Sequence, residues 1–141
     1  MSTAPSAPTP ITLQNFESCS IPREEYTHRA HLTVAYLYLR AHPLSDAIIK
    51  MRTGIHRFNA AKGIENTPTG GYHETLTIAW MRVIDGTMKS YGSLGSPDEL
   101  LAQHPHLLCV TLLRLFYTRD RIMSAEARAS WVEPDLARLP D

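Results

Sequence analysis

The sequence lacks the features that would direct a protein to a membrane, a nucleic acid or an oxidising compartment. No apolar run among its 141 residues approaches the roughly 20 residues needed to cross a bilayer. Fourteen basic residues balance 14 acidic ones, so there is no net positive charge to attract polyphosphate. Only two cysteines occur, Cys19 and Cys109, and they are far apart and fit no zinc-ribbon or Cys-x-x-Cys spacing. We therefore expect a cytoplasmic protein that binds neither nucleic acid nor a membrane.

The chain divides into a short tail and one larger segment. Residues 1–12 are small and proline-rich, with neither the basic start nor the apolar centre of a signal peptide. The whole chain is 43% hydrophobic, and residues 13–141 are long enough for one hydrophobic core but not for a second independent one. The sequence thus predicts a disordered tail over residues 1–12 and a single helical domain over residues 13–141.

Apolar residues recur at helical spacing along most of this domain. Residues 107–116 are apolar on nearly all sides, which favours a buried helix, although β-branched residues in this run leave a strand open. These patterns predict an all-α, single-domain antiparallel bundle of four to five main helices, a fold that builds sites from side chains on facing helices. The other expected helices cover residues 28–41, residues from 44 to a cap at Gly63, residues about 72–91, residues from Ser96 to about His104, and residues 124–129.

Three histidines at the starts of two of these helices are the most chemically specific feature of the sequence. His28 and His31 are separated by one helical turn, so they share a face with Cβ atoms roughly 5–6 Å apart, within reach of one metal ion. His73 and Glu74 open the helix expected near residues 72–91. The positive end of a helix dipole disfavours imidazolium and keeps imidazole neutral, which is the form that binds metals. The sequence predicts a metal site made of His28, His31, His73 and Glu74.

A histidine-rich site with one carboxylate suits a divalent transition metal, namely zinc, iron, copper, nickel or manganese. Glu74 is a candidate for the fourth ligand; because it is turned about 100° from His73 around the helix axis, it is also a candidate for a general base or for a residue that orients a ligating histidine. Tyr26 and Tyr72 lie beside the histidines in sequence and are candidates for the pocket wall and for catalysis. With three or four protein ligands, coordination positions remain for water or substrate. We therefore expect a metal-dependent enzyme acting on a small molecule by hydrolytic, lyase or oxidative chemistry.

Two other interpretations remain open at this point. The same cavity would suit a non-catalytic protein that binds a metal or a small ligand. The helices could instead form a homodimeric interaction module, in which the histidines are ordinary polar residues of helix starts and core. Tight metal binding with no coordination position for exchangeable water or substrate would indicate the binding protein. Unchanged behaviour after substitution of His28 or His73 by alanine would indicate the interaction module.

The histidine motifs also carry a resemblance. T-H-x-A-H-L over residues 27–32, G-Y-H-E-T-x-T over residues 71–77 and the closing segment over residues 121–136 resemble the motifs of a family of small bacterial proteins of unassigned function. The likeness extends from about Phe16 to Pro140. It implies a compact helical protein in which the three histidines and Glu74 belong to the family motifs, and it implies no substrate.

Overall fold

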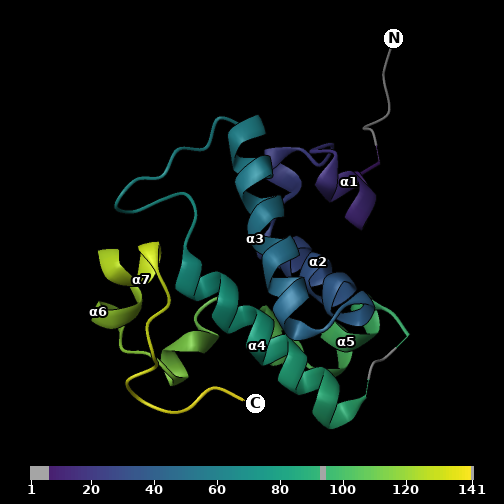
Figure 1. Cartoon of the computed structure of the whole chain (residues 1–141). Helices are drawn as coiled ribbons and strands as arrows, with labels where there is room; N and C mark the ends of the chain where they lie inside the picture. The colour runs from purple at the N-terminus through teal and green to yellow at the C-terminus, as the bar shows by residue number, and fades with distance from the viewer. Residues whose placement is uncertain (1–6, 93–94, 141) are drawn as a thin grey trace.

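The computed structural model describes residues 7–92 and 95–140, and every regular element within them is helical. The all-α prediction is therefore confirmed. The three longest elements are α2 (His28–Ala41), α3 (Leu44–Ala61) and α4 (Glu74–Tyr91), which contact one another pairwise. In Figure 1, α3 stands upright near the centre with α2 beside it, and α4 runs obliquely below them. This three-helix arrangement brings the start of α4 close to the start of α2.

Shorter elements cover the ends of these helices. In Figure 1, α6 and α7 lie on the left beside the start of α4, and α1 lies on the opposite side near the N-terminus. α1 contacts α2 and α3, α5 contacts α2, and α7 contacts α4. These elements are α1 (Leu13–Glu17), α5 (Pro97–Gln103), α6 (Arg119–Ile122), α7 (Ala125–Ala129) and the 3-10 turns η1 (Arg23–Glu25), η2 (Pro105–Leu108) and η3 (Leu112–Leu115).

Helix starts follow the capping residues that the sequence provides. Thr27, Ser96 and Ser124 each accept a hydrogen bond from the backbone N–H three residues later, at the starts of α2, α5 and α7. At the end of α3, Gly63 takes a positive φ of 69°, which favours glycine. Local chemistry therefore determines these boundaries, and those at Ser96, Ser124 and Gly63 agree with the prediction. The helix expected from about residue 72 begins at Glu74 instead, because His73 is its N-cap residue.

The buried helix predicted over residues 107–116 is wrong. The segment forms η2 and η3, separated by residues 109–111. Leu107 and Leu113 are buried in the core, whereas Val110 and Leu115 are 66% and 64% exposed. This stretch runs along the surface of the molecule, so only part of its apolar surface can face the core. The break also leaves the Leu107 carbonyl oxygen to accept a bond from another helix rather than from its own.

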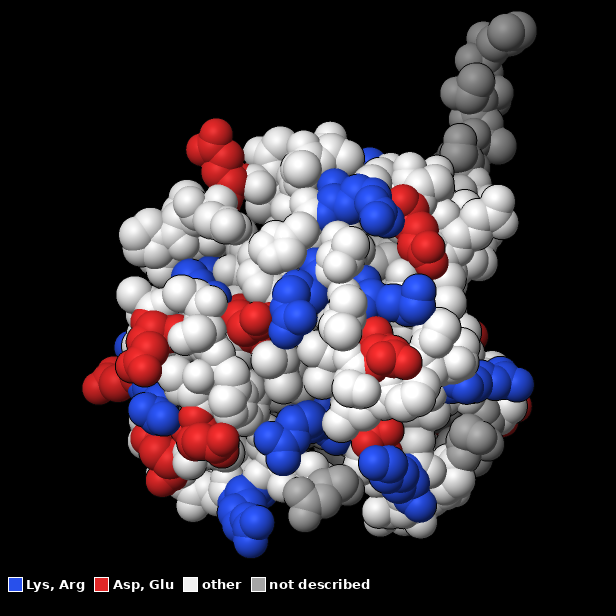
Figure 2. All heavy atoms as spheres, in the orientation of Figure 1, with Lys and Arg blue, Asp and Glu red and all other residues white. Residues whose placement is uncertain are grey.

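One cluster of buried apolar side chains extends along the chain from Phe16 to Leu139. Of the predicted tail, residues 1–6 lie outside the described residues, and residues 7–12 are irregular but in contact with the helices. The Thr9 N–H donates to Glu25 Oε1 at 2.7 Å, and Ile11 packs against the core. Figure 2 shows acidic and basic side chains interspersed over the visible face. Among the described residues, no helix is long and apolar enough to cross a membrane.

Candidate functional site: a pocket lined by histidines

The three predicted histidines meet around one pocket. His28 and His31 come from the first turn of α2, and His73 comes from the start of α4, as helical spacing predicted. The pocket has a volume of about 300 Å³, and we call it the histidine pocket. Its wall is completed by Tyr26, Thr27, Ile55, Asn59, Gly71, Tyr72, Leu76, Thr77 and Trp80.

His31 lies in the wall of the histidine pocket and is only partly exposed. Protein atoms surround its ring, yet part of its surface still reaches the pocket. Burial and, to a smaller extent, the nearby His28 lower the pKa of His31 to about 4. Its Nδ1 is hydrogen-bonded to the Tyr26 hydroxyl at 3.2 Å, and burial raises the pKa of that phenol. His31 and Tyr26 therefore form a neutral pair at physiological pH.

His28 is oriented by a carbonyl from a distant segment. Its Nε2 lies 2.9 Å from the Leu107 carbonyl oxygen, and its ring packs edge-on against Trp80 at 4.8 Å between centroids. A carbonyl oxygen can only accept, so Nε2 carries the hydrogen and Nδ1 keeps the lone pair in the neutral ring. Metal-ligating histidines are commonly held in this way through their other ring nitrogen.

His73 has a structural role that the sequence did not reveal. Its Nδ1 accepts the Leu76 backbone N–H at 3.1 Å, which caps α4, and its Nε2–H donates to the Ile122 carbonyl oxygen at 2.7 Å. Both ring nitrogens are therefore engaged, and the side chain is only 6% exposed. Burial is the main cause that lowers the pKa of His73, so the ring stays neutral. His73 ties α4 to the C-terminal segment.

Glu74 points away from the histidine pocket and does not line it. Its carboxylate accepts from Arg52 Nε at 2.9 and 3.2 Å and from the Tyr72 hydroxyl at 2.6 Å. Burial and the bond to Glu74 raise the pKa of Tyr72. Sequence reasoning missed Arg52, although it sits one residue after the buried Met51 on α3. It also missed Asn59, which is four residues after the pocket-lining Ile55 and so shares its face.

These contacts bear directly on the predicted metal centre. Within residues 7–92 and 95–140, no group of three or more His, Cys, Asp or Glu side chains is arranged to hold a metal ion. A site containing all four predicted ligands would require His73 to leave Ile122 and Leu76, and Glu74 to leave Arg52. The four-residue ligand set stays a prediction. His28 uses its Nε2 and His31 uses its Nδ1 in hydrogen bonds to protein groups. The ring nitrogens left for a metal are therefore His28 Nδ1 and His31 Nε2.

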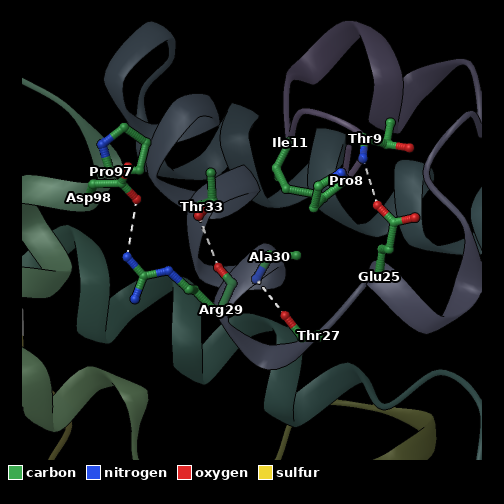
Figure 3. Close-up of a pocket in the computed structure, with 10 residues that line it drawn as sticks. All are labelled: Pro8, Thr9, Ile11, Glu25, Thr27, Arg29, Ala30, Thr33, Pro97 and Asp98. Carbon is green, nitrogen blue, oxygen red and sulfur yellow. Dashed lines mark hydrogen bonds and ion pairs between the residues drawn. The ribbon is translucent and has the colours of Figure 1, made fainter. Parts of the chain in front are cut away.

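A second hollow, on the solvent side of α2, is less suited to chemistry (Figure 3). Its charged groups already have partners, because Arg29 pairs with Asp98 at 3.1 Å and Glu25 accepts the Thr9 N–H. The Arg29–Asp98 pair is exposed, and such pairs contribute little to stability. Thr33 donates back to the carbonyl of its own helix. The histidine pocket therefore remains the better candidate site.

Comparison with known proteins supplies no analogy for this site. No protein-family model, no curated protein and no solved structure matches the chain. The function is therefore inferred from the geometry of the histidine pocket and from the protonation of its side chains.

The buried His31 should make the protein less stable in acid. Its pKa is about 4 when folded and 6.5 ordinarily, so between these values only the unfolded chain binds the proton. The free energy of unfolding is therefore highest above about pH 6.5 and falls as the pH drops toward 4. The loss is up to about 3 kcal/mol, since each unit of pKa difference corresponds to ~1.4 kcal/mol. Urea unfolding at a series of pH values measures this slope. His31→Gln should flatten it and the exposed control His106→Gln should not; an equal slope in His31→Gln would contradict the assignment.

Proposed function

We propose that this protein is a metal-dependent enzyme that acts on a small molecule bound in the histidine pocket, with His28 and His31 as its metal ligands. The observation that carries the proposal is the orientation of His28, whose Nε2–H is held by the Leu107 carbonyl so that Nδ1 is left as a donor to metal. We place the His31 proton on Nδ1, toward Tyr26, which leaves Nε2 as the second donor.

The low pKa of His31 also supports this assignment. An imidazole with a pKa of about 4 is a weak general base near neutral pH, where efficient bases have pKa values closer to 7. The same low pKa removes protons as competitors for the ring nitrogen, so metal binding would persist in mild acid. Two protein ligands leave several coordination positions for water and substrate. A bound transition metal would supply Lewis-acid or water-activating chemistry.

The walls of the pocket limit the substrate to a small molecule. Trp80, Leu76 and Ile55 offer apolar surface, while Asn59 and Thr77 offer hydrogen-bonding groups. A volume of about 300 Å³ is at the low end for ligand pockets, which generally span about 300–1,000 Å³. A compact organic molecule with one or two polar groups fits these dimensions.

A second candidate function is a metal-free small-ligand-binding protein that uses the same pocket. The observation that favours it is the full engagement of His73, because a pocket with two available imidazole nitrogens can recognise a ligand by hydrogen bonds alone. The two candidates differ in whether the wild-type protein retains metal.

Metal analysis of alanine variants tests the proposal. Protein purified without chelator and reconstituted with zinc, iron, manganese, nickel or copper should hold about one equivalent of one of them. His28→Ala and His31→Ala should each weaken retention at least about tenfold, since each removes one of two protein ligands. His73→Ala should retain the metal, as should the control His106→Ala.

Each other outcome has a distinct meaning. If His73→Ala loses the metal while still folded, His73 is itself a ligand. The two-histidine site would then give way to the four-residue ligand set predicted from the sequence. Retention in His28→Ala would remove His28 from the site altogether. Absence of metal from the wild-type protein under every reconstitution would reject the metalloenzyme and leave the ligand-binding function.

A further inference from the structure

Another cavity lies on the other side of Tyr72 from the histidine pocket, between the loop before α4 and helix α7. Its volume is about 420 Å³, and we call it the Arg128 cavity. In Figure 1 the loop after α3 extends to the left and passes close to α7. Residues of this loop and of α7 line the cavity. Its lining includes His56, Tyr72, Glu74, Ala125, Arg128 and Ala129.

Of the two charged groups that line the Arg128 cavity, Glu74 is paired with an opposite charge and Arg128 is not, within the part of the chain that the structure describes. The Glu74 carboxylate is neutralised by Arg52 and further bonded by the Tyr72 hydroxyl. Arg128 donates from one terminal nitrogen to the Gly70 carbonyl oxygen at 3.2 Å, which leaves its charge in place. Its Nε is buried and has no acceptor among the described residues, where Arg128 also forms no ion pair. An uncompensated guanidinium therefore borders a cavity.

A buried donor without an acceptor costs about 1–3 kcal/mol and calls for an explanation, and a bound water, ion or ligand is one such explanation. The guanidinium plane matches a carboxylate, which can accept two parallel bonds from it. The rest of the wall is largely apolar. Ala125 and Ala129 project from one face of α7, and the rings of His56 and Tyr72 lie 4.1 Å apart between centroids on the facing side.

We propose that the Arg128 cavity binds a small monocarboxylate with a compact apolar or aromatic body. The carboxylate pairs with Arg128, and the apolar body contacts Ala125, Ala129 and the His56–Tyr72 pair. A phosphate dianion suits the cavity less well than a monocarboxylate, because Glu74 also lines the cavity and its carboxylate repels a dianion more strongly than a monoanion. This site is separate from the histidine pocket and does not depend on metal there.

Benzoate is a suitable probe, with benzamide as its uncharged counterpart of nearly the same shape. Titration of the full chain by calorimetry should give saturable benzoate binding, and benzamide should bind at least about tenfold more weakly because it lacks the charge. Arg128→Gln should weaken benzoate to a similar extent. Arg119→Gln, which removes an exposed arginine from nearby α6, should have no effect.

Two further measurements keep the test decisive. If Arg128→Gln fails to fold, NMR titration of the wild-type protein should shift the Arg128 side-chain N–H and the Ala125 and Ala129 methyl signals. Equal affinity for benzoate and benzamide, no saturable binding, or shifts confined to His31 and Trp80 would overturn the proposal. His31→Ala should leave benzoate binding unchanged, so a failure of the metal site and a failure of this site are distinguishable.

Discussion

Phe16→Ala is expected to lower the free energy of unfolding by about 3–5 kcal/mol, which is typical for truncation of a fully buried aromatic residue. Phe16 is 0% exposed and is the only buried residue of α1. Its ring stacks against Tyr26 at 5.5 Å and against Phe58 at 6.4 Å between centroids. Urea unfolding measures the loss, and Leu136→Ala at an exposed position should change stability by less than about 0.5 kcal/mol.

The fit between Phe16 and Gly54 provides a matched control. A Cβ added at Gly54 would lie 2.2 Å from the Phe16 ring, so α3 carries a glycine where the ring needs space. Gly54→Ala should therefore destabilise by about 1–3 kcal/mol, although alanine alone favours a helix. The double variant Phe16→Ala/Gly54→Ala should be more stable than the sum of the two losses predicts. Simple additivity would show that the two residues do not share this space.

Phe16 also connects the core to the candidate site. It stacks on Tyr26, and Tyr26 holds His31 through Nδ1. Loss of the Phe16 ring should admit water around His31 and move its pKa from about 4 toward 6.5. NMR titration of the His31 ring in Phe16→Ala measures this. An unchanged pKa would mean that Tyr26 is held in place without Phe16.

His73→Ala is expected to cost about 2–4 kcal/mol of folding stability while leaving metal binding in place. The substitution removes the cap of α4, worth about 1 kcal/mol, and leaves the Ile122 carbonyl oxygen without its donor in a buried position, worth about 1–3 kcal/mol. His73→Asn can restore the cap but cannot reach Ile122, so its stability should be intermediate. Thermal unfolding compares the variants.

Two results would argue against this role of His73. A loss below about 0.5 kcal/mol in His73→Ala would mean that neither bond contributes in solution. Equal stability of His73→Asn and His73→Ala would mean that the cap does not matter. His106→Ala, which removes an exposed histidine, controls for loss of an imidazole as such.

Much of the fold could be predicted because the relevant interactions are local. The starts of α2, α5 and α7 follow threonine and serine caps, and the three long helices follow the spacing of their apolar residues. Residues 107–116 could not be predicted in this way. An apolar run is compatible with several backbone conformations, and the choice depended on how much of the run could reach the core.

The candidate site, like the fold, could be predicted only in part from the sequence. Helical spacing was enough to place His28 and His31 on one face of α2, and the start of α4 brings His73 to the same pocket, as the sequence led us to expect. It did not reveal that Glu74 would turn toward Arg52. That contact depends on how α3 lies against α4, which side-chain packing between the two helices determines.

The sequence by itself determined an all-α chain, most helix boundaries and the identity of the histidines that share a pocket. Only the tertiary structure decided which of their nitrogens are available. The acceptor for His28 is the carbonyl of Leu107, and the acceptor for His73 is the carbonyl of Ile122. These partners lie 79 and 49 residues away in the chain, so no local pattern contains them. The protonation of an imidazole depends on its hydrogen-bond partners, and here those partners are supplied by the folded chain as a whole.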